Sequence, residues 1–130
     1  MDFTFKKIER LCSKKAIDDL FINGKSKTKF PFKLVYKISN FDSPFPARAM
    51  FVVPKKKYKR ANKRNTIKRQ MREVYRLNKH TLYQSLQTQK MDLMFICLSN
   101  EYLEYSVVEK GMIELIEFLR KAHFQENKKE

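Results

Sequence analysis

The sequence predicts an α/β protein in which a small sheet packs against helices. Strand-like and helix-like segments alternate along the chain, and a strand pattern stands on each side of the most strongly periodic helical segment. The chain has 130 residues, of which 42% are hydrophobic and 33% charged. That size and composition are typical of a globular protein with one core and not of a disordered chain. We therefore expect one domain over residues 1–130.

The chain begins with a basic lead-in over residues 1–12, which we expect to be extended, with hydrophobic side chains available to pack on the body of the protein. Ser13 can cap the N-terminus of a short helix, and Asn23-Gly24 is typical of its end. The hydrophobic face of this helix is Ile17, Leu20 and Phe21, spaced i, i+3 and i+4.

Two strand patterns follow the first helix. Residues 25–29 are polar and basic and predict a loop, whereas residues 32–39 alternate between two faces. One face carries Phe32, Leu34, Tyr36 and Ile38, which we expect in the core, and the other carries Lys33, Val35 and Lys37. Residues 48–53 are hydrophobic on both sides, which favours a central strand, and Pro54 ends it.

The segment from Ala61 to Arg76 is predicted to form a helix between two strands, called the central helix below. At 100° per residue one arc of it is suited to the core, namely Ile67, Met71, Val74, Tyr75 and Asn78. The neighbouring arc is cationic and contains Asn65, Lys68, Arg69, Arg72 and Arg76. A helix cannot bury both arcs, because burying several unpaired guanidinium groups costs far more free energy than the burial of their methylene groups contributes.

The charge of this region indicates an anionic partner. Between Lys55 and Lys79 the chain has twelve basic residues and one acidic residue, Glu73, a net +11 out of +15 for the whole chain. A merely solvated helix face usually mixes the two signs. Like charges at this density repel one another and destabilise the isolated fold, so nucleic acid is the favoured partner.

The remaining segments complete the α/β pattern. Residues 80–90 are polar and predict a surface segment, whereas residues 91–98 are hydrophobic enough for a strand covered on both faces. Ser106 and Glu109 have the spacing of a capping box that opens a final helix. Its hydrophobic stripe is Val108, Met112, Leu115, Ile116 and Leu119. Residues 125–130 are expected to be a frayed, flexible tail.

The sequence has no pattern typical of a disulfide scaffold, a metal site, a nuclease site or a membrane segment. Cys12 and Cys97 do not make a disulfide scaffold, and neither the cysteines nor the histidines have zinc spacing, so we expect no metal or cofactor bound by the protein itself. The carboxylates have no spacing of a two-metal nuclease site; they are Glu9, Asp18, Asp19, Asp42, Glu73 and Asp92. Without an apolar leader or an 18-residue apolar run, we expect a cytoplasmic protein with no membrane partner.

The central helix resembles the arginine-asparagine-arginine helix of the bacterial ribonuclease P protein subunit. The matching residues are Ala61, Arg64, Asn65, Ile67, Lys68, Arg69, Arg72 and Glu73. Residues 48–56 are similar to the strand that ends in Ser-Lys-Lys in that family, with Pro54 in place of the serine, and residues 21–26 are similar to its Phe-x-x-Gly-x-Ser. Residues 57–60 lack the family's glycine, and Ile17 replaces its aromatic residue.

This resemblance implies the fold and the function. The fold is an α/β (α+β) sandwich of the ribosomal protein S5 domain 2-like class, with the order α-β-β-β-α-β-α and a left-handed β-α-β crossover. The function is that of the protein subunit of an endoribonuclease that removes the 5′ leader of precursor tRNA. Its RNA subunit carries the chemistry and requires Mg²⁺, while the protein, expected to be a monomer, joins ribonuclease P RNA and precursor tRNA. A ribosomal or general RNA-binding protein is the alternative.

The resemblance also assigns residues to two surfaces. Ribonuclease P RNA would be bound by Lys55, Lys56, Arg60, Lys63, Arg64, Asn65, Lys68, Arg69, Arg72 and Arg76. The leader would be bound by Ile17, Phe21, Lys33, Val35 and Lys37. No catalytic residue is assigned in the protein. Phe21 could instead complete the core face of the first helix, and Lys33 and Lys37 could be ordinary solvated strand residues.

Overall fold

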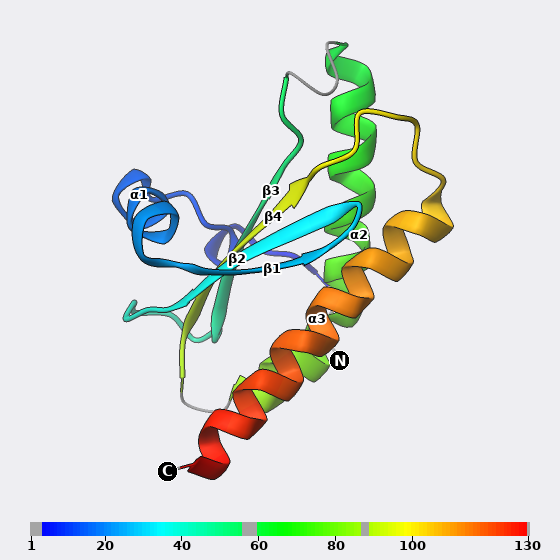
Figure 1. Cartoon of the computed structure of the whole chain (residues 1–130). Coiled ribbons are helices and arrows are strands. Elements are labelled where there is room, and N and C mark those ends of the chain that lie inside the picture. The colour runs from blue at the N-terminus through cyan, green and yellow to red at the C-terminus, as the bar shows by residue number, and fades with distance from the viewer. Residues whose placement is uncertain (1–3, 56–59, 87–88, 130) are drawn as a thin grey trace.

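The computed structural model describes residues 4–55, 60–86 and 89–129, with the backbone alone for residues 123–129. A four-stranded sheet forms the middle layer, with α1 on one face and α2 and α3 on the other (Figure 1). The elements in chain order are η1 (Lys7–Glu9), α1 (Lys14–Asn23), β1 (Lys25–Lys29), β2 (Phe32–Ile38), β3 (Ala47–Val52), α2 (Ala61–Leu86), β4 (Met91–Cys97) and α3 (Tyr105–Lys129). The predicted α/β class and element order are confirmed.

The strands lie in the order β1-β2-β4-β3. β2 pairs antiparallel with β1 and β4, whereas β3 and β4 are parallel. β4 is interior, as predicted, but the prediction of a central position for the strand at 48–53 is wrong, because β3 lies at an edge. Ala49 and Phe51 are buried on the face toward α2, whereas Met50 and Val52 on the face toward α1 are half-buried.

The main core lies between the sheet and the helices α2 and α3. Four aromatic rings form its centre, and their centroids lie 5.5–5.9 Å apart in five contacts; they are Phe5, Phe51, Tyr75 and Phe95. A smaller cluster lies under α1 and contains Leu11, Leu20, Val35 and Met94. The predicted core positions Phe32 and Leu34 are fully buried, and Tyr36 packs partly buried against the same core. The prediction of a core position for Ile38 is wrong, because this last residue of β2 is 46% exposed.

Helix α2 is longer than the sequence pattern predicted. Residues 80–86 were expected in a polar surface segment, but they continue the helix, and Leu82 and Leu86 are fully buried in the main core. The spacing from Tyr75 through Lys79, Leu82 and Leu86 keeps these side chains on one face of the helix. Asn78, expected in the core arc, is half-buried, and its side-chain amide donates to the carbonyl of Val74 at 2.8 Å.

Two further local predictions are wrong. Residues 25–29 form the strand β1 and not a loop, because they pair along β2 while most of their side chains stay in solvent. Helix α3 begins at Tyr105, so that Ser106 lies inside its first turn and does not cap it, and the helix continues to Lys129 through the segment expected to fray. The left-handed sense of the β3-α2-β4 crossover stays a prediction.

The lead-in before α1 is not simply extended. It contains the short helix η1, and the backbone N–H of Leu11 donates to the carbonyl of Ala49 at 2.9 Å, so this segment runs beside the outer edge of β3. Phe5 and Leu11 are buried, whereas Ile8 is 45% exposed. Among the described residues, no helix is both long enough and apolar enough to span a membrane.

Candidate RNA-binding surface

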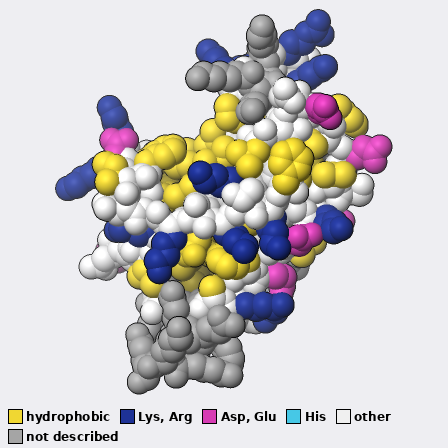
Figure 2. All heavy atoms as spheres, viewed as in Figure 1, with side chains coloured by type: hydrophobic (Ala, Val, Ile, Leu, Met, Phe, Trp, Pro, Cys, Tyr) yellow, Lys and Arg dark blue, Asp and Glu magenta, His cyan; other side chains and the backbone are white. Residues whose placement is uncertain are grey.

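The rotation of α2 about its axis is fixed by its buried side chains. Ile67, Met71, Val74 and Tyr75 lie in the core, as predicted, so the neighbouring arc faces away from it. Asn65 and Arg69 on that arc are exposed, and Lys68 and Arg72 are half-buried. The first turns of α2 rise past the end of β3 (Figure 1), where Lys and Arg side chains project in the space-filling view (Figure 2).

The cations of this basic face are poorly balanced within the protein. Six of them form no ion pair with a described residue; they are Lys55, Arg60, Lys63, Lys68, Arg69 and Arg72. The first turn of α2 also contains no acidic residue. The positive end of the helix dipole therefore adds to the side-chain charges and does not meet the carboxylate that helix N-termini usually attract. Both features favour an anion at this end.

Arg76 and Arg64 are in different settings. Arg76 pairs with Glu73 one turn earlier at 2.5 Å, and this hydrogen bond holds the pKa of the Glu73 carboxyl below its ordinary value. Arg64 is half-buried on the first turn. Lys63 is exposed beside it. Lys55 and Arg60 are exposed at the two ends of the connection between β3 and α2, and the predicted contact Lys56 lies outside the described residues.

A second surface lies where α1 crosses the sheet. Phe21 is 61% exposed and Ile22 is 78% exposed, so the alternative that Phe21 completes the core is wrong. Ile17 is half-buried against the small cluster under α1. An exposed aromatic ring on a short helix is suited to stacking on an unpaired base.

The strand residues predicted for this second surface, Lys33, Val35 and Lys37, differ in burial and in their contacts. Lys33 is half-buried and pairs in register with Ile96, which in turn pairs with Val52 of β3, so the three residues form one row across the sheet. Val35 is 7% exposed and packs under α1, where it also touches the position of Gly24. No sequence pattern indicated Val52 and Ile96, because only the strand register brings them into one row with Lys33.

Lys37 is held by α1. Its ammonium group lies 2.7 Å from the carboxylate of Asp19, which also accepts from the Asn23 amide at 2.6 Å. Both contacts lower the pKa of the Asp19 carboxyl, and the hydrogen bond from Lys37 has the larger effect. On the same face Asp92 lies between Lys37 and Arg48 in register and accepts a bidentate pair of hydrogen bonds from Arg48, at 2.8 and 3.0 Å.

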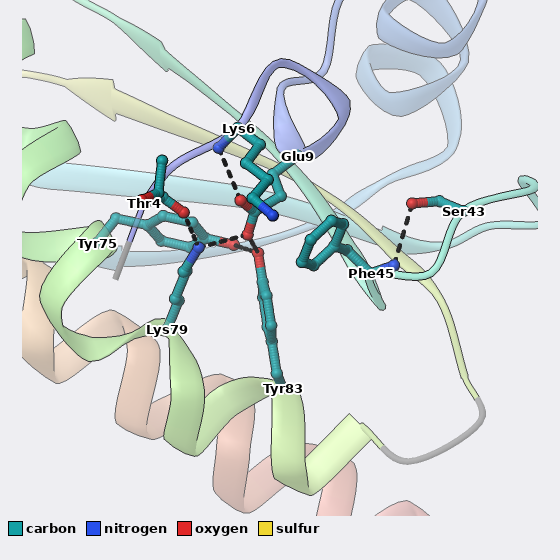
Figure 3. Close-up of polar contacts among 8 residues, drawn as sticks. All are labelled: Thr4, Lys6, Glu9, Ser43, Phe45, Tyr75, Lys79 and Tyr83. Carbon is teal, nitrogen blue, oxygen red and sulfur yellow. Dashed lines mark hydrogen bonds and ion pairs between the residues drawn. The ribbon is translucent and has the colours of Figure 1, made fainter. Parts of the chain in front are cut away.

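A buried polar cluster connects the lead-in to α2 (Figure 3). The carboxylate of Glu9 accepts from the Lys79 ammonium at 2.6 Å, from the Tyr83 hydroxyl at 2.7 Å and from the backbone N–H of Lys6 at 2.8 Å. Lys79 also donates to the carbonyl of Thr4 at 2.5 Å. Lys79 and Glu9 are 2% and 0% exposed, so Lys79 contributes nothing to the basic surface. No sequence pattern had paired these two residues.

Comparison with known proteins shows the family to which the chain belongs. A family model described as Ribonuclease P matches residues 5–122. The chain belongs to the ribonuclease P protein family. The ribonuclease P protein component of Porphyromonas gingivalis is 35% identical over 112 residues, which cover 85% of this chain and 82% of that protein. That of Syntrophus aciditrophicus is 40% identical over 76 residues, or 58% of this chain and 60% of that protein.

Solved structures of the family have the same fold. The RNase P protein of Thermotoga maritima superposes with a TM-score of 0.68 at 25% identity, covering 85% of this chain and 96% of that one. The Staphylococcus aureus RNase P protein also gives 0.68, at 18% identity, over 85% of this chain and 94% of that one. The resemblance seen in the α2 motif is therefore confirmed, and the partner that membership in the ribonuclease P protein family implies is ribonuclease P RNA.

Proposed function

We propose that this chain binds ribonuclease P RNA through the basic face of α2 and assists the RNA in removing the 5′ leader of precursor tRNA. The observation that carries the proposal is the set of unbalanced cations along α2 and at the end of β3. Arginine and lysine meet phosphates, and the planar fork of arginine binds them bidentately. One protein molecule would join one RNA, and Asn65 would add a neutral donor and acceptor on the same face.

The leader would bind between α1 and the sheet. The exposed ring of Phe21 supports this placement, together with the row that Lys33 forms with Ile96 and Val52. A single-stranded segment needs aromatic or apolar platforms for its bases and a cation for its backbone, and this surface offers both. Val35 would act beneath the surface by supporting α1, and Lys37 would act by fixing α1 through Asp19.

The chemistry would belong to the RNA subunit and its Mg²⁺ ions. The settings of the protein's carboxylates support this division. Glu9 is buried with Lys79, Asp92 is paired with Arg48, Asp19 with Lys37, and Glu73 with Arg76. Glu9, Asp92 and Asp19 each neutralise a cation on another element, and Glu73 neutralises one on its own helix. These are structural roles and not the role of a metal ligand.

The test is reconstitution with a bacterial ribonuclease P RNA at low Mg²⁺. Cleavage of a precursor tRNA should rise when the protein is added, and the gain should be larger for a substrate that has a leader. The protein alone should cleave nothing. Tight RNA binding without any stimulation would instead favour a ribosomal or general RNA-binding role.

Salt dependence tests the surface itself. If the six unpaired cations each neutralise one phosphate, log affinity should fall against log salt with a slope of roughly −4 to −5. Arg72→Ala should reduce the size of that slope by about one. Lys121→Ala, an exposed position on α3, is the matched control and should leave it unchanged. A complex that is insensitive to salt would contradict the electrostatic account.

A further inference from the structure

A pocket of about 450 Å³ opens beside the N-terminal end of α1, away from Phe21 at the other end of that helix. One wall is the lead-in, with Lys7, Ile8 and Arg10, and the other wall comes from the connection between β2 and β3 and from Arg48. The volume lies in the range of small-ligand sites, about 300–1,000 Å³. The basic face of α2 and the row around Lys33 contribute no residue to it.

The lining of this pocket has the chemistry of a nucleotide site. Lys7 and Arg10 are exposed and form no ion pair with a described residue. Ile8 is 45% exposed and, with Phe41, supplies apolar surface. Ser13, the N-cap of α1, also lines the pocket, so the positive end of that helix dipole lies at the pocket. Asp42 is the acidic side chain of the lining.

The wall formed by the lead-in is held by the buried cluster of Glu9, Lys79 and Tyr83 (Figure 3). The carboxylate of Glu9 in η1 accepts a hydrogen bond from Lys79 of α2, and the backbone N–H of Leu11 donates to the carbonyl of Ala49 in β3. Lys7 lies two residues before Glu9 and Arg10 directly after it, so the backbone of both is fixed. Both side chains are exposed, and the Arg10 guanidinium lies 5.6 Å from the centroid of the Phe5 ring.

The opposite wall is held by the same cluster and by two cations. The ring of Phe45 lies 6.0 Å from the Lys79 ammonium and 6.4 Å from the Tyr83 ring (Figure 3). The guanidinium of Arg48 stacks on Phe41 at 4.1 Å, and Lys90 donates to the carbonyl of Ser43. A site whose two walls are fixed before binding loses less conformational entropy when it binds a ligand.

We propose that this pocket binds an unpaired nucleotide, with its phosphate at Lys7 and Arg10 and its base against Ile8 and Phe41. The inference rests on the proposed function, because it needs an RNA at this protein. The nucleotide comes either from the leader beyond the part that contacts Phe21 or from a single-stranded segment of ribonuclease P RNA. The shared chemistry is one phosphate and one exposed base.

The test compares the double variant Lys7→Ala/Arg10→Ala with the control Lys110→Ala/Lys121→Ala, which removes the same charge from exposed positions of α3. Two quantities are measured for each: assembly with ribonuclease P RNA, and binding of the assembled holoenzyme to precursor tRNAs with a short or a long leader. The pocket variant should lower the size of the salt slope of the affected step by about 0.7, the value for one single-strand phosphate contact. Ile8→Glu, which adds a negative charge, should weaken the same step.

The two arms identify the source of the nucleotide. A loss confined to the long-leader substrate assigns it to the leader, and a loss of assembly assigns it to the RNA subunit. If the pocket variant matches its control in both arms, the inference is overturned. Arg69→Ala separates this result from failure of the proposed function. If it weakens assembly while the pocket variant does not, only the pocket is refuted; if it too has no effect, the proposed RNA-binding surface is refuted.

Discussion

Replacing Lys79 with methionine should cost about 3–5 kcal/mol of unfolding free energy, because Glu9 would keep a buried charge without its counter-ion. The structure supports a value in this range and not the smaller one of a surface pair. The two side chains are 2% and 0% exposed, and their charged atoms lie 2.6 Å apart. Lys79→Met also removes the hydrogen bond to the carbonyl of Thr4. For a chain of 130 residues the loss corresponds to a fall in Tm of roughly 10–20 °C.

The assay is urea and thermal unfolding followed by circular dichroism, without RNA. Lys121→Met, at an exposed position on α3, is the control and should unfold as the parent does. The double variant Glu9→Gln/Lys79→Met should be more stable than Lys79→Met, with a coupling of about 1–3 kcal/mol, because neither charge then remains buried alone. A cost below about 1 kcal/mol for Lys79→Met would refute the reasoning, since the pair would then behave as a solvated one.

Three further predictions concern the surfaces and the packing. Phe21→Ala should leave Tm unchanged but weaken binding of substrates that have a leader by about 1–3 kcal/mol, and equal loss without a leader would contradict the stacking role. The pKa of the Asp19 carboxyl lies below its ordinary value of 3.8, so the pair of Asp19 with Lys37 should stabilise the fold above pH 3.8. This stabilisation should be lost as the pH falls through the lowered pKa. In acid unfolding, Lys37→Met should not show this loss of stability. Gly111→Ala should lower Tm by overpacking worth about 1–3 kcal/mol despite a better helix propensity, because its Cβ would lie 2.8 Å from Phe32; a rise in Tm would show that α3 shifts freely.

The sequence alone determined the features that repeat over short distances. The period of α2 predicted Ile67, Met71 and Val74 in the core and the cations of the neighbouring arc outside it, because successive side chains of a helix turn by a fixed angle. The alternation in β2 predicted the buried face of Phe32 and Leu34 for the same reason. The α2 motif also predicted the family, because its residue types and spacing resemble those of the family's central helix, and the family model matches residues 5–122.

Tertiary structure decided what depends on partners far away in the chain. The hydrophobic pattern of β3 predicted two covered faces but not its edge position, because burial of faces does not specify the neighbours in a sheet. The charge count of residues 55–79 included Lys79, but the fold brings Glu9, seventy positions away, within 2.6 Å and buries the pair. Ile96 and Val52 joined Lys33 only through strand register. Local periodicity fixes which way a side chain points, whereas pairing and charge compensation depend on which segments meet in space.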